Sequence, residues 1–203
     1  MEEDKQAPNV LAERLMVLRK LNAWTLEDVA SRSGLTKSYL SKLERGRSSP
    51  TIATMLKLAR ALNTSVDKLI GDGEQADEIL HVPAGKRVPF SPSKERLGYN
   101  YEAIAVERAD KSMQPFIMMP PFELRDEPQQ MSSHAGEELI YLISGDMEVV
   151  FADRTVTMAA GDSLYFNAAL AHRSRSLGST PAQALVVVSD PGRIRSSAAG
   201  AQS

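Results

Sequence analysis

A glycine turn between two short amphipathic segments constrains the fold of this chain more than any other feature. The segments lie near 26–32 and 36–44, and a Ser-Gly-Leu turn at 33–35 separates them. So short a connection forces two helices to pack directly against each other at a steep angle. In the second segment Leu40 and Leu43 share one face, and the opposite face is almost free of apolar residues. The pattern predicts a helix that presents a polar, basic surface.

The whole stretch from residue 9 to residue 71 has a helical pattern. Apolar residues recur at spacings of three and four from Leu11 to Leu21 and again from Ile52 to Leu62. Capping residues such as Thr25, turn glycines and a proline divide the stretch into short helices. Five helices are therefore expected, near residues 9–22, 26–32, 36–44, 51–61 and 65–70.

The sequence pattern changes beyond residue 80. Most of the 11 prolines lie in residues 81–190, among short runs of strand type separated by turn-forming stretches. Several short strands at about ten-residue spacing predict an all-β sandwich or barrel of the jelly-roll kind. We expect strands at 138–143, 147–151, 155–158, 163–166 and 184–188. We also expect a linker at 72–80 and disordered tails at 1–8 and 191–203.

The two predicted domains carry opposite charge, although the formal net charge of the chain is only −2. Residues 9–71 contain 11 Lys or Arg and 5 Asp or Glu, whereas residues 72–203 contain 12 and 18. A basic domain beside an acidic one is expected when only the first contacts phosphate. A chance distribution of charge over a solvated surface is the alternative that composition leaves open.

Composition also limits the chemistry of the chain. It contains no cysteine, so disulfides, zinc fingers and thiol nucleophiles are excluded, and a metal would need His, Asp or Glu. No apolar run approaches the roughly 20 residues that cross a bilayer, and the acidic N-terminal segment does not suit a signal peptide. We therefore expect a cytoplasmic protein without a membrane partner.

The polar face of the helix near 36–44 carries side chains that suit DNA. Early outward residues of a helix in the major groove reach base edges, and Lys and Ser can both read them. Helix starts and nearby arginines bind phosphate instead. Taken singly, each residue could equally belong to a solvated face. The expected base-reading residues are Lys37, Ser38, Lys42 and Tyr39, and Ser41 lies on the same DNA-binding face. The expected phosphate contacts are Thr25, Thr36, Arg45 and Arg47.

Taken together, three stretches resemble the lambda repressor-like, Xre-type helix-turn-helix family. They are Leu-Arg-Lys at 18–20, Thr-Leu-Glu-Asp-Val-Ala at 25–30 and the run at 33–52. The resemblance covers about residues 9–71. It implies a compact five-helix, all-α domain that binds palindromic double-stranded operator DNA as a homodimer. It also implies that Arg19 of the first helix pairs with Glu44 at the end of the recognition helix.

The three histidines all lie in the second domain, and two of them are candidate metal ligands. His134, Glu138 and His172 offer imidazole and carboxylate groups that suit a divalent metal such as Zn, Fe, Mn or Ni. Residues 134–145 and 161–172 resemble the two signature motifs of the cupin fold, over about residues 115–190. The resemblance implies a jelly-roll barrel with these three ligands, but Ser132 occupies the place of a fourth. A metal-free pocket that binds a polar effector directly is the alternative.

The order of the two modules resembles that of one-component transcriptional regulators with a cupin sensor. It implies a DNA-binding regulator, in most cases a repressor and not an enzyme, that responds to an amino acid, a polyamine or a sulfur metabolite. Two alternatives stay open: a metal-dependent cupin oxygenase or isomerase that carries a DNA-binding domain, and a DNA-binding module whose second half only dimerises. Further residues expected to bind the effector are Ser132, Arg125, Tyr101 and Tyr165.

Overall fold

A computed structural model describes residues 10–71, 78–90, 98–108, 111–122 and 131–189. The expected tails, and residues 72–77 of the expected linker, lie outside these described residues. The first described range forms five helices, and each agrees with its expected position to within one residue at either end. They are α1 (Val10–Leu21), α2 (Leu26–Ser33), α3 (Lys37–Glu44), α4 (Ile52–Ala61) and α5 (Val66–Ile70). Within the described ranges, none of the helices has the length and apolar character needed to span a bilayer.

Side-chain caps determine where these helices begin. Thr25 accepts a hydrogen bond from the backbone of Asp28, whose carboxylate accepts one from the backbone of Thr25 in return. Thr36 and Thr51 cap α3 and α4 in the same way through one hydrogen bond each. Gly34 ends α2 with a φ of 69°, a left-handed conformation that glycine adopts without strain. This glycine allows the chain to turn directly from α2 into α3.

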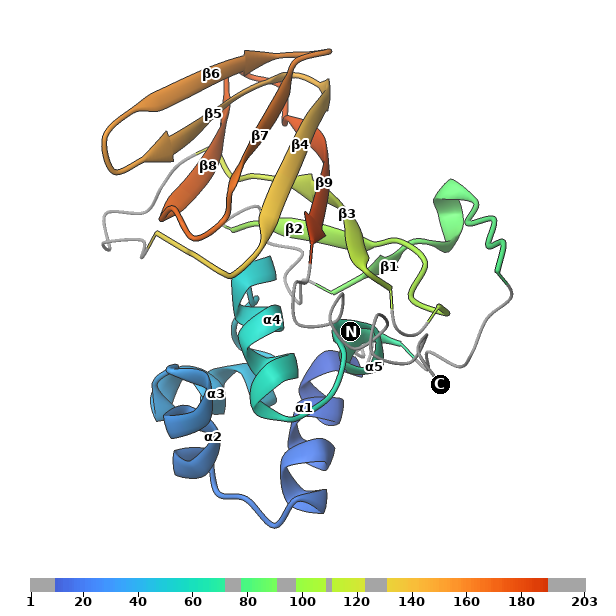
Figure 1. Cartoon of the computed structure of the whole chain (residues 1–203), viewed down its shortest axis with the longest axis vertical. Helices are drawn as coiled ribbons and strands as arrows, with labels where there is room; N and C mark the ends of the chain where they lie inside the picture. Colours follow the sequence, from blue (N-terminus) through green and yellow to red (C-terminus); the bar gives the residue numbers. More distant parts are fainter. Residues whose placement is uncertain (1–9, 72–77, 91–97, 109–110, 123–130, 190–203) are drawn as a thin grey trace, which may run out of the picture.

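The second half of the chain forms two antiparallel sheets (Figure 1). Phe151 of one sheet packs edge-on against Phe166 of the other, with ring centroids 5.1 Å apart, so the sheets enclose a common core. The larger sheet has the order β1 (Val88–Pro89), β2 (Asn100–Ala103), β3 (Met113–Met119), β9 (Gln183–Ser189), β4 (Glu137–Ser144) and β7 (Ser163–Asn167); the smaller has the order β6 (Thr155–Ala159), β5 (Asp146–Phe151) and β8 (His172–Leu177).

The strand pattern of the sequence predicts five of the nine described strands, namely β4, β5, β6, β7 and β9. It does not predict β8, because the inward positions of that strand are polar. Ser176 is buried there, and its hydroxyl donates to the carbonyl of Pro120 at 2.7 Å and accepts from the N–H of Ala182 at 3.0 Å. Hydrogen bonds to distant backbone thus replace the apolar contacts that an alternating strand pattern reveals.

The helices pack against the larger sheet, and the buried apolar residues of both halves form one continuous cluster. A buried ion pair lies at this junction, between Asp67 of α5 and Lys111, whose side chains are 3% and 7% exposed. Lys111 also donates to the carbonyl of Ala105, and the amide of Gln114 donates to the second oxygen of Asp67 at 3.4 Å. Because the pair is desolvated, it fixes how the two halves meet more than it adds to stability.

Candidate functional site

Helix α3 exposes the polar face that its sequence predicts. Leu40 and Leu43 are 3% and 2% exposed, whereas Lys37, Ser38 and Lys42 face solvent. Helices α2 and α3 lie next to each other in the part of the helical domain that is farther from the sheets (Figure 1). The arrangement leaves the exposed face of α3 accessible to a partner as large as DNA.

The expected ion pair between α1 and α3 is confirmed. Arg19 binds Glu44 through two parallel hydrogen bonds, Nε to Oε1 at 2.6 Å and Nη2 to Oε2 at 2.8 Å. Its remaining Nη1 donates to the carbonyl of Trp24 at 3.0 Å. The hydrogen bond to Glu44 raises the pKa of Arg19. This bidentate contact fixes the C-terminal end of α3 relative to α1.

Tyr39 lies differently from its neighbours on α3. It is half-buried against the core, and its hydroxyl donates to the carbonyl of Ser49 at 3.4 Å. Burial raises the pKa of Tyr39, and hydrogen bonds with Thr54 and Ser48 partly offset that rise. Tyr39 therefore connects α3 with the segment that leads into α4.

The expected phosphate contacts all lie at the surface. Thr25, Thr36, Arg45 and Arg47 are exposed, at the start of α2, at the start of α3 and just beyond α3. The Nε of Arg45 donates to the carbonyl of Ser41 at 3.0 Å, which directs its guanidinium along the helix end. Ser41 itself is half-buried.

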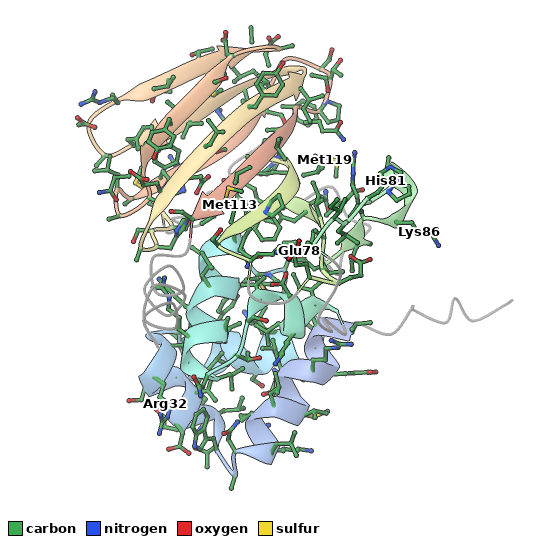
Figure 2. The ribbon with its side chains drawn as sticks, turned by 45° about the vertical axis from the view of Figure 1, so that its right-hand side comes forward. Arg32, Glu78, His81, Lys86, Met113 and Met119 are labelled. Carbon is green, nitrogen blue, oxygen red and sulfur yellow. The ribbon has the colours of Figure 1, made fainter. Side chains whose placement is uncertain are left out.

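The three expected metal ligands meet in the interior of the second domain. Nε2 of His134 lies 3.0 Å from Oε2 of Glu138, and Nε2 of His172 lies 3.5 Å from the same oxygen. All three side chains are less than 10% exposed, and their ligand atoms lie within 4.8 Å of one another. The third histidine, His81, lies apart from them near Lys86, on a segment that projects from the side of the molecule (Figure 2).

Backbone carbonyls orient both imidazoles. Nδ1 of His134 lies 3.1 Å from the carbonyl of Ala135, and Nδ1 of His172 lies 2.8 Å from that of Leu170. A carbonyl only accepts, so each Nδ1 carries a hydrogen, and in a neutral imidazole Nε2 then presents a lone pair to Glu138. Lone pairs that face a carboxylate require positive charge between them, either a proton on each Nε2 or one metal ion. The same outer contacts orient histidine ligands in metal sites.

The pKa directions agree with a shared positive charge. Burial by itself would raise the pKa of Glu138, but the hydrogen bonds with His134 and His172, together with the charges of these two residues, outweigh it and leave that pKa below its ordinary value. Burial by itself would lower the pKa of His172, but the hydrogen bond to Glu138, the charge of Glu138 and the hydrogen bond to the carbonyl of Leu170 together outweigh it and raise that pKa. Glu138 is thus held as a carboxylate between two imidazoles.

A small cavity beside these ligands lies at the junction of the two domains. Its free volume is about 20 Å³. Three lining residues come from the beginning of α4 and the other nine from the second domain. In chain order the lining residues are Thr51, Ile52, Ala53, Tyr99, Tyr101, Met118, Ser132, His134, Glu138, His172, Arg173 and Ser174.

The structure brings two of the four expected effector-binding residues to this cavity. Tyr101 lines it from β2, and Ser132 lines it while its hydroxyl donates to the carbonyl of His172 at 3.4 Å. Tyr165 does not line it, because that side chain is 62% exposed on β7. Arg125 lies outside the described residues.

Sequence reasoning missed Tyr99, Arg173 and the three lining residues of α4. Tyr99 precedes Tyr101 by two positions, and their rings stack with centroids 5.6 Å apart, so strand alternation could have found it. Arg173 has no such signal. It follows His172 in a strand whose polar pattern resembles that of a surface loop.

Comparisons with known proteins agree with this architecture. A helix-turn-helix family model matches residues 15–69, and a cupin domain model matches residues 119–188. The chain is 47% identical over 53 residues to the uncharacterized HTH-type transcriptional regulator y4dJ of Sinorhizobium fredii, a match that covers 26% of this chain and 69% of that protein.

Two further proteins are similar over most of the chain. The HTH-type transcriptional regulator PuuR of Escherichia coli is 22% identical over 172 residues, which are 85% of this chain and 89% of PuuR. The crystal structure of an HTH_3 family transcriptional regulator from Vibrio cholerae superposes with a TM-score of 0.59 at 24% identity, covering 90% of this chain and 96% of that chain. The chain therefore belongs to the HTH-type transcriptional regulators, and it combines a helix-turn-helix DNA-binding domain with a cupin domain.

Proposed function

We propose that this regulator binds a small-molecule effector in the cavity between its domains and that the effector changes its affinity for operator DNA. One observation carries the proposal: Thr51, Ile52 and Ala53 of the helical domain line the same cavity as the histidines of the cupin domain. Because the walls of the cavity belong to both domains, a bound molecule makes different contacts when the domains are arranged differently. Such a difference is what allows a ligand to shift an equilibrium between two states.

The domain limits and the effector class belong to the same proposal. Residues 9–71 bind DNA, residues 81–190 form the sensor, and the protein acts as a cytoplasmic repressor. The effector is an amino acid, a polyamine or a sulfur metabolite. Its polar groups meet Tyr101, Ser132 and the histidine cluster, which supply the hydrogen-bonding groups of the cavity.

We assign base reading to Lys37, Ser38 and Lys42, which form the exposed face of α3. Phosphate contacts come from Thr25, Thr36, Arg45 and Arg47 at the exposed helix ends. Ser41 and Tyr39 support this face from half-buried positions, and Tyr39 does so through its contact with the carbonyl of Ser49. The DNA partner is a palindromic double-stranded operator.

The residues at the histidine cluster fit one divalent metal ion. The two Nε2 atoms and the carboxylate of Glu138 converge in a buried position, and the carbonyls of Ala135 and Leu170 hold the imidazoles in the ligating tautomer. Two histidines and a carboxylate leave coordination positions open, so a bound Zn, Fe, Mn or Ni ion would supply a Lewis acid for a donor atom of the effector. The hydroxyl of Ser132 is not counted as a ligand.

A homodimer forms through the outer face of the larger sheet. Leu139, Tyr141 and Ile143 alternate along β4 and are 37%, 43% and 43% exposed, and Tyr165 pairs with Leu139 on the neighbouring β7. Together these four residues form an apolar strip over adjacent strands. A second copy of the chain is the occupant that a palindromic operator requires, because each half-site takes one helix-turn-helix.

A metal-dependent enzyme is the second candidate function, and the set of two histidines and one carboxylate favours it. The regulators among its relatives favour sensing. If the purified protein contained stoichiometric iron and consumed oxygen with a candidate substrate, its function would be catalysis and not sensing.

An effector that acts through the cavity should change both thermal stability and operator affinity. With an operator selected from random DNA and a broad metabolite panel, we expect at least one compound to raise Tm. The same compound should change the Kd for the operator by about 5-fold or more, as anisotropy titrations measure it. A panel that leaves both quantities unchanged would contradict the proposal.

Changes on and beyond α3 should have different effects on DNA binding. Lys42→Ala should relax the preference at one operator position by about 1–3 kcal/mol, because a base contact is lost. Arg47→Ala should weaken binding to all sequences about equally, because a phosphate contact is lost. Binding to a library of operator variants measures both, with Lys86→Ala as the control remote from α3. Specific binding that survives both changes would show that another surface reads the DNA.

Metal binding should require the buried histidines and not the exposed one. His134→Ala should abolish stoichiometric metal, because it removes one of three ligands, whereas His81→Ala should retain it. Elemental analysis after purification from metal-supplemented medium, followed by Co²⁺ titration, checks both variants. Equal metal content in the two variants would place the metal elsewhere.

The apolar strip should control the oligomeric state. Tyr141→Lys should convert the dimer to a monomer, because it places a charge in the centre of the interface. Val17→Lys, at a similarly exposed position on α1, should leave the dimer intact. Sedimentation velocity distinguishes the two, and a Tyr141→Lys variant that remains dimeric would exclude this face.

A further inference from the structure

Arg173 carries a buried polar atom that the fold does not satisfy. Its Nε is excluded from solvent and has no hydrogen-bond partner among the described residues. Arg173 lines the cavity close to Tyr99. Burial raises the pKa of Tyr99 to about 12, and the positive charge of Arg173 opposes part of this rise. A buried N–H without an acceptor is unfavourable and rare in native structures, so an acceptor from outside the chain is expected.

The other polar groups of the cavity already have partners within the chain. Oε2 of Glu138 faces Nε2 of both imidazoles, at 3.0 Å from His134 and 3.5 Å from His172. The hydroxyl of Tyr99 donates to the carbonyl of Ser174 at 2.8 Å and accepts from the N–H of Ser174 at 2.6 Å. Within the described ranges, no carboxylate lies within ion-pair distance of Arg173. The charge that this cavity lacks is therefore negative.

The cavity is too small in this conformation for an organic molecule. A free volume of about 20 Å³ holds about one water molecule or one metal ion. Its strand walls belong to continuous ladders, such as the pairing of β2 with β3 and of β3 with β9. The wall formed by α4 is different, because the N–H of Ile52 donates to the hydroxyl of Tyr101 across the domain junction. A ligand that enters the cavity therefore displaces the α4 wall more readily than the strands, which the ladders hold in place.

We propose that the effector is a small acidic molecule, whose anionic group binds Arg173 and whose entry displaces the first turn of α4 from Tyr101. The proposal rests on the proposed sensing function and specifies its ligand. Among the three effector classes it selects acids, such as amino acids, over polyamines. The positive end of the α4 dipole also lines the cavity and adds to the attraction for an anion.

The displaced turn is connected to the recognition helix. The hydroxyls of Thr51 and Thr54 are 3.1 Å apart, and the side chain of Thr54 forms a hydrogen bond with the hydroxyl of Tyr39 on α3. A movement at the first turn of α4 therefore reaches α3 through contacts that exist in the structure. An acid bound at Arg173 alters the position of the base-reading face through these contacts.

The experiment compares acids with their amides on the full-length protein by isothermal titration calorimetry. The probes are L-alanine, succinate and 3-mercaptopropionate, each beside its primary amide, together with 1,3-diaminopropane and spermidine. At least one acid should bind at least about 30-fold more tightly than its amide, since a buried charge pair loses that much when truncated. Arg173→Gln should weaken the binding of that acid to a similar extent. Arg154→Gln, which removes an exposed arginine of the same domain, should not.

Operator affinity in the same series separates this inference from the function on which it rests. The binding acid should shift operator Kd in the wild type and in Arg154→Gln but not in Arg173→Gln. If amines bind and acids do not, the proposal of an acidic ligand is overturned. The same holds if acids bind Arg173→Gln with unchanged affinity. Both results leave the proposed sensing function intact. If no probe binds, the acidic ligand is refuted, and the broad metabolite panel then decides whether sensing also fails. If Arg173→Gln does not fold, the acid-amide comparison on the wild type decides alone.

Discussion

The contact between the first turn of α4 and the cupin cavity is the constraint on which this regulator depends. It places Thr51, Ile52 and Ala53 beside the buried histidine cluster, so the cupin domain and the helix-turn-helix domain both contribute walls to one cavity. The Asp67–Lys111 pair joins α5 to the second domain at another point of the junction. One end of the junction is therefore fixed by a buried charge pair, and the other closes over the cavity through Ile52 and Tyr101.

Electrostatics explains why the cavity is polar without being unstable. Glu138 keeps its charge because two imidazoles, each oriented by a backbone carbonyl, face it. A metal ion can bind all three ligand atoms, and a proton on each Nε2 lets both imidazoles donate to Glu138, so the cluster is complete in either state. Arg173 is the group that the described part of the fold leaves without a hydrogen bond at Nε. An arginine N–H without an acceptor, beside a satisfied cluster, favours acids among the ligands proposed for the cavity.

Much of this architecture follows from local sequence, and the rest depends on tertiary contacts. Caps at Thr25, Thr36 and Thr51 and the turn at Gly34 place the helices to within a residue, because these signals act within one helical turn. The family resemblance predicts the ligands His134, Glu138 and His172. Polar strand β8, the cavity wall of α4 and the unsatisfied Nε of Arg173 were not predictable, because each is created by residues far apart in sequence.

Amide hydrogen exchange at the start of α4 tests the central claim most directly. The measurement compares Ile52 and Ala53 with and without a compound that shifts operator affinity, and uses the amides of β4 as the internal reference. If the effector displaces the first turn of α4 from Tyr101, exchange at Ile52 should change together with exchange in α3, while β4 stays constant. An effector that alters operator affinity without any change at Ile52 or Ala53 would contradict the account.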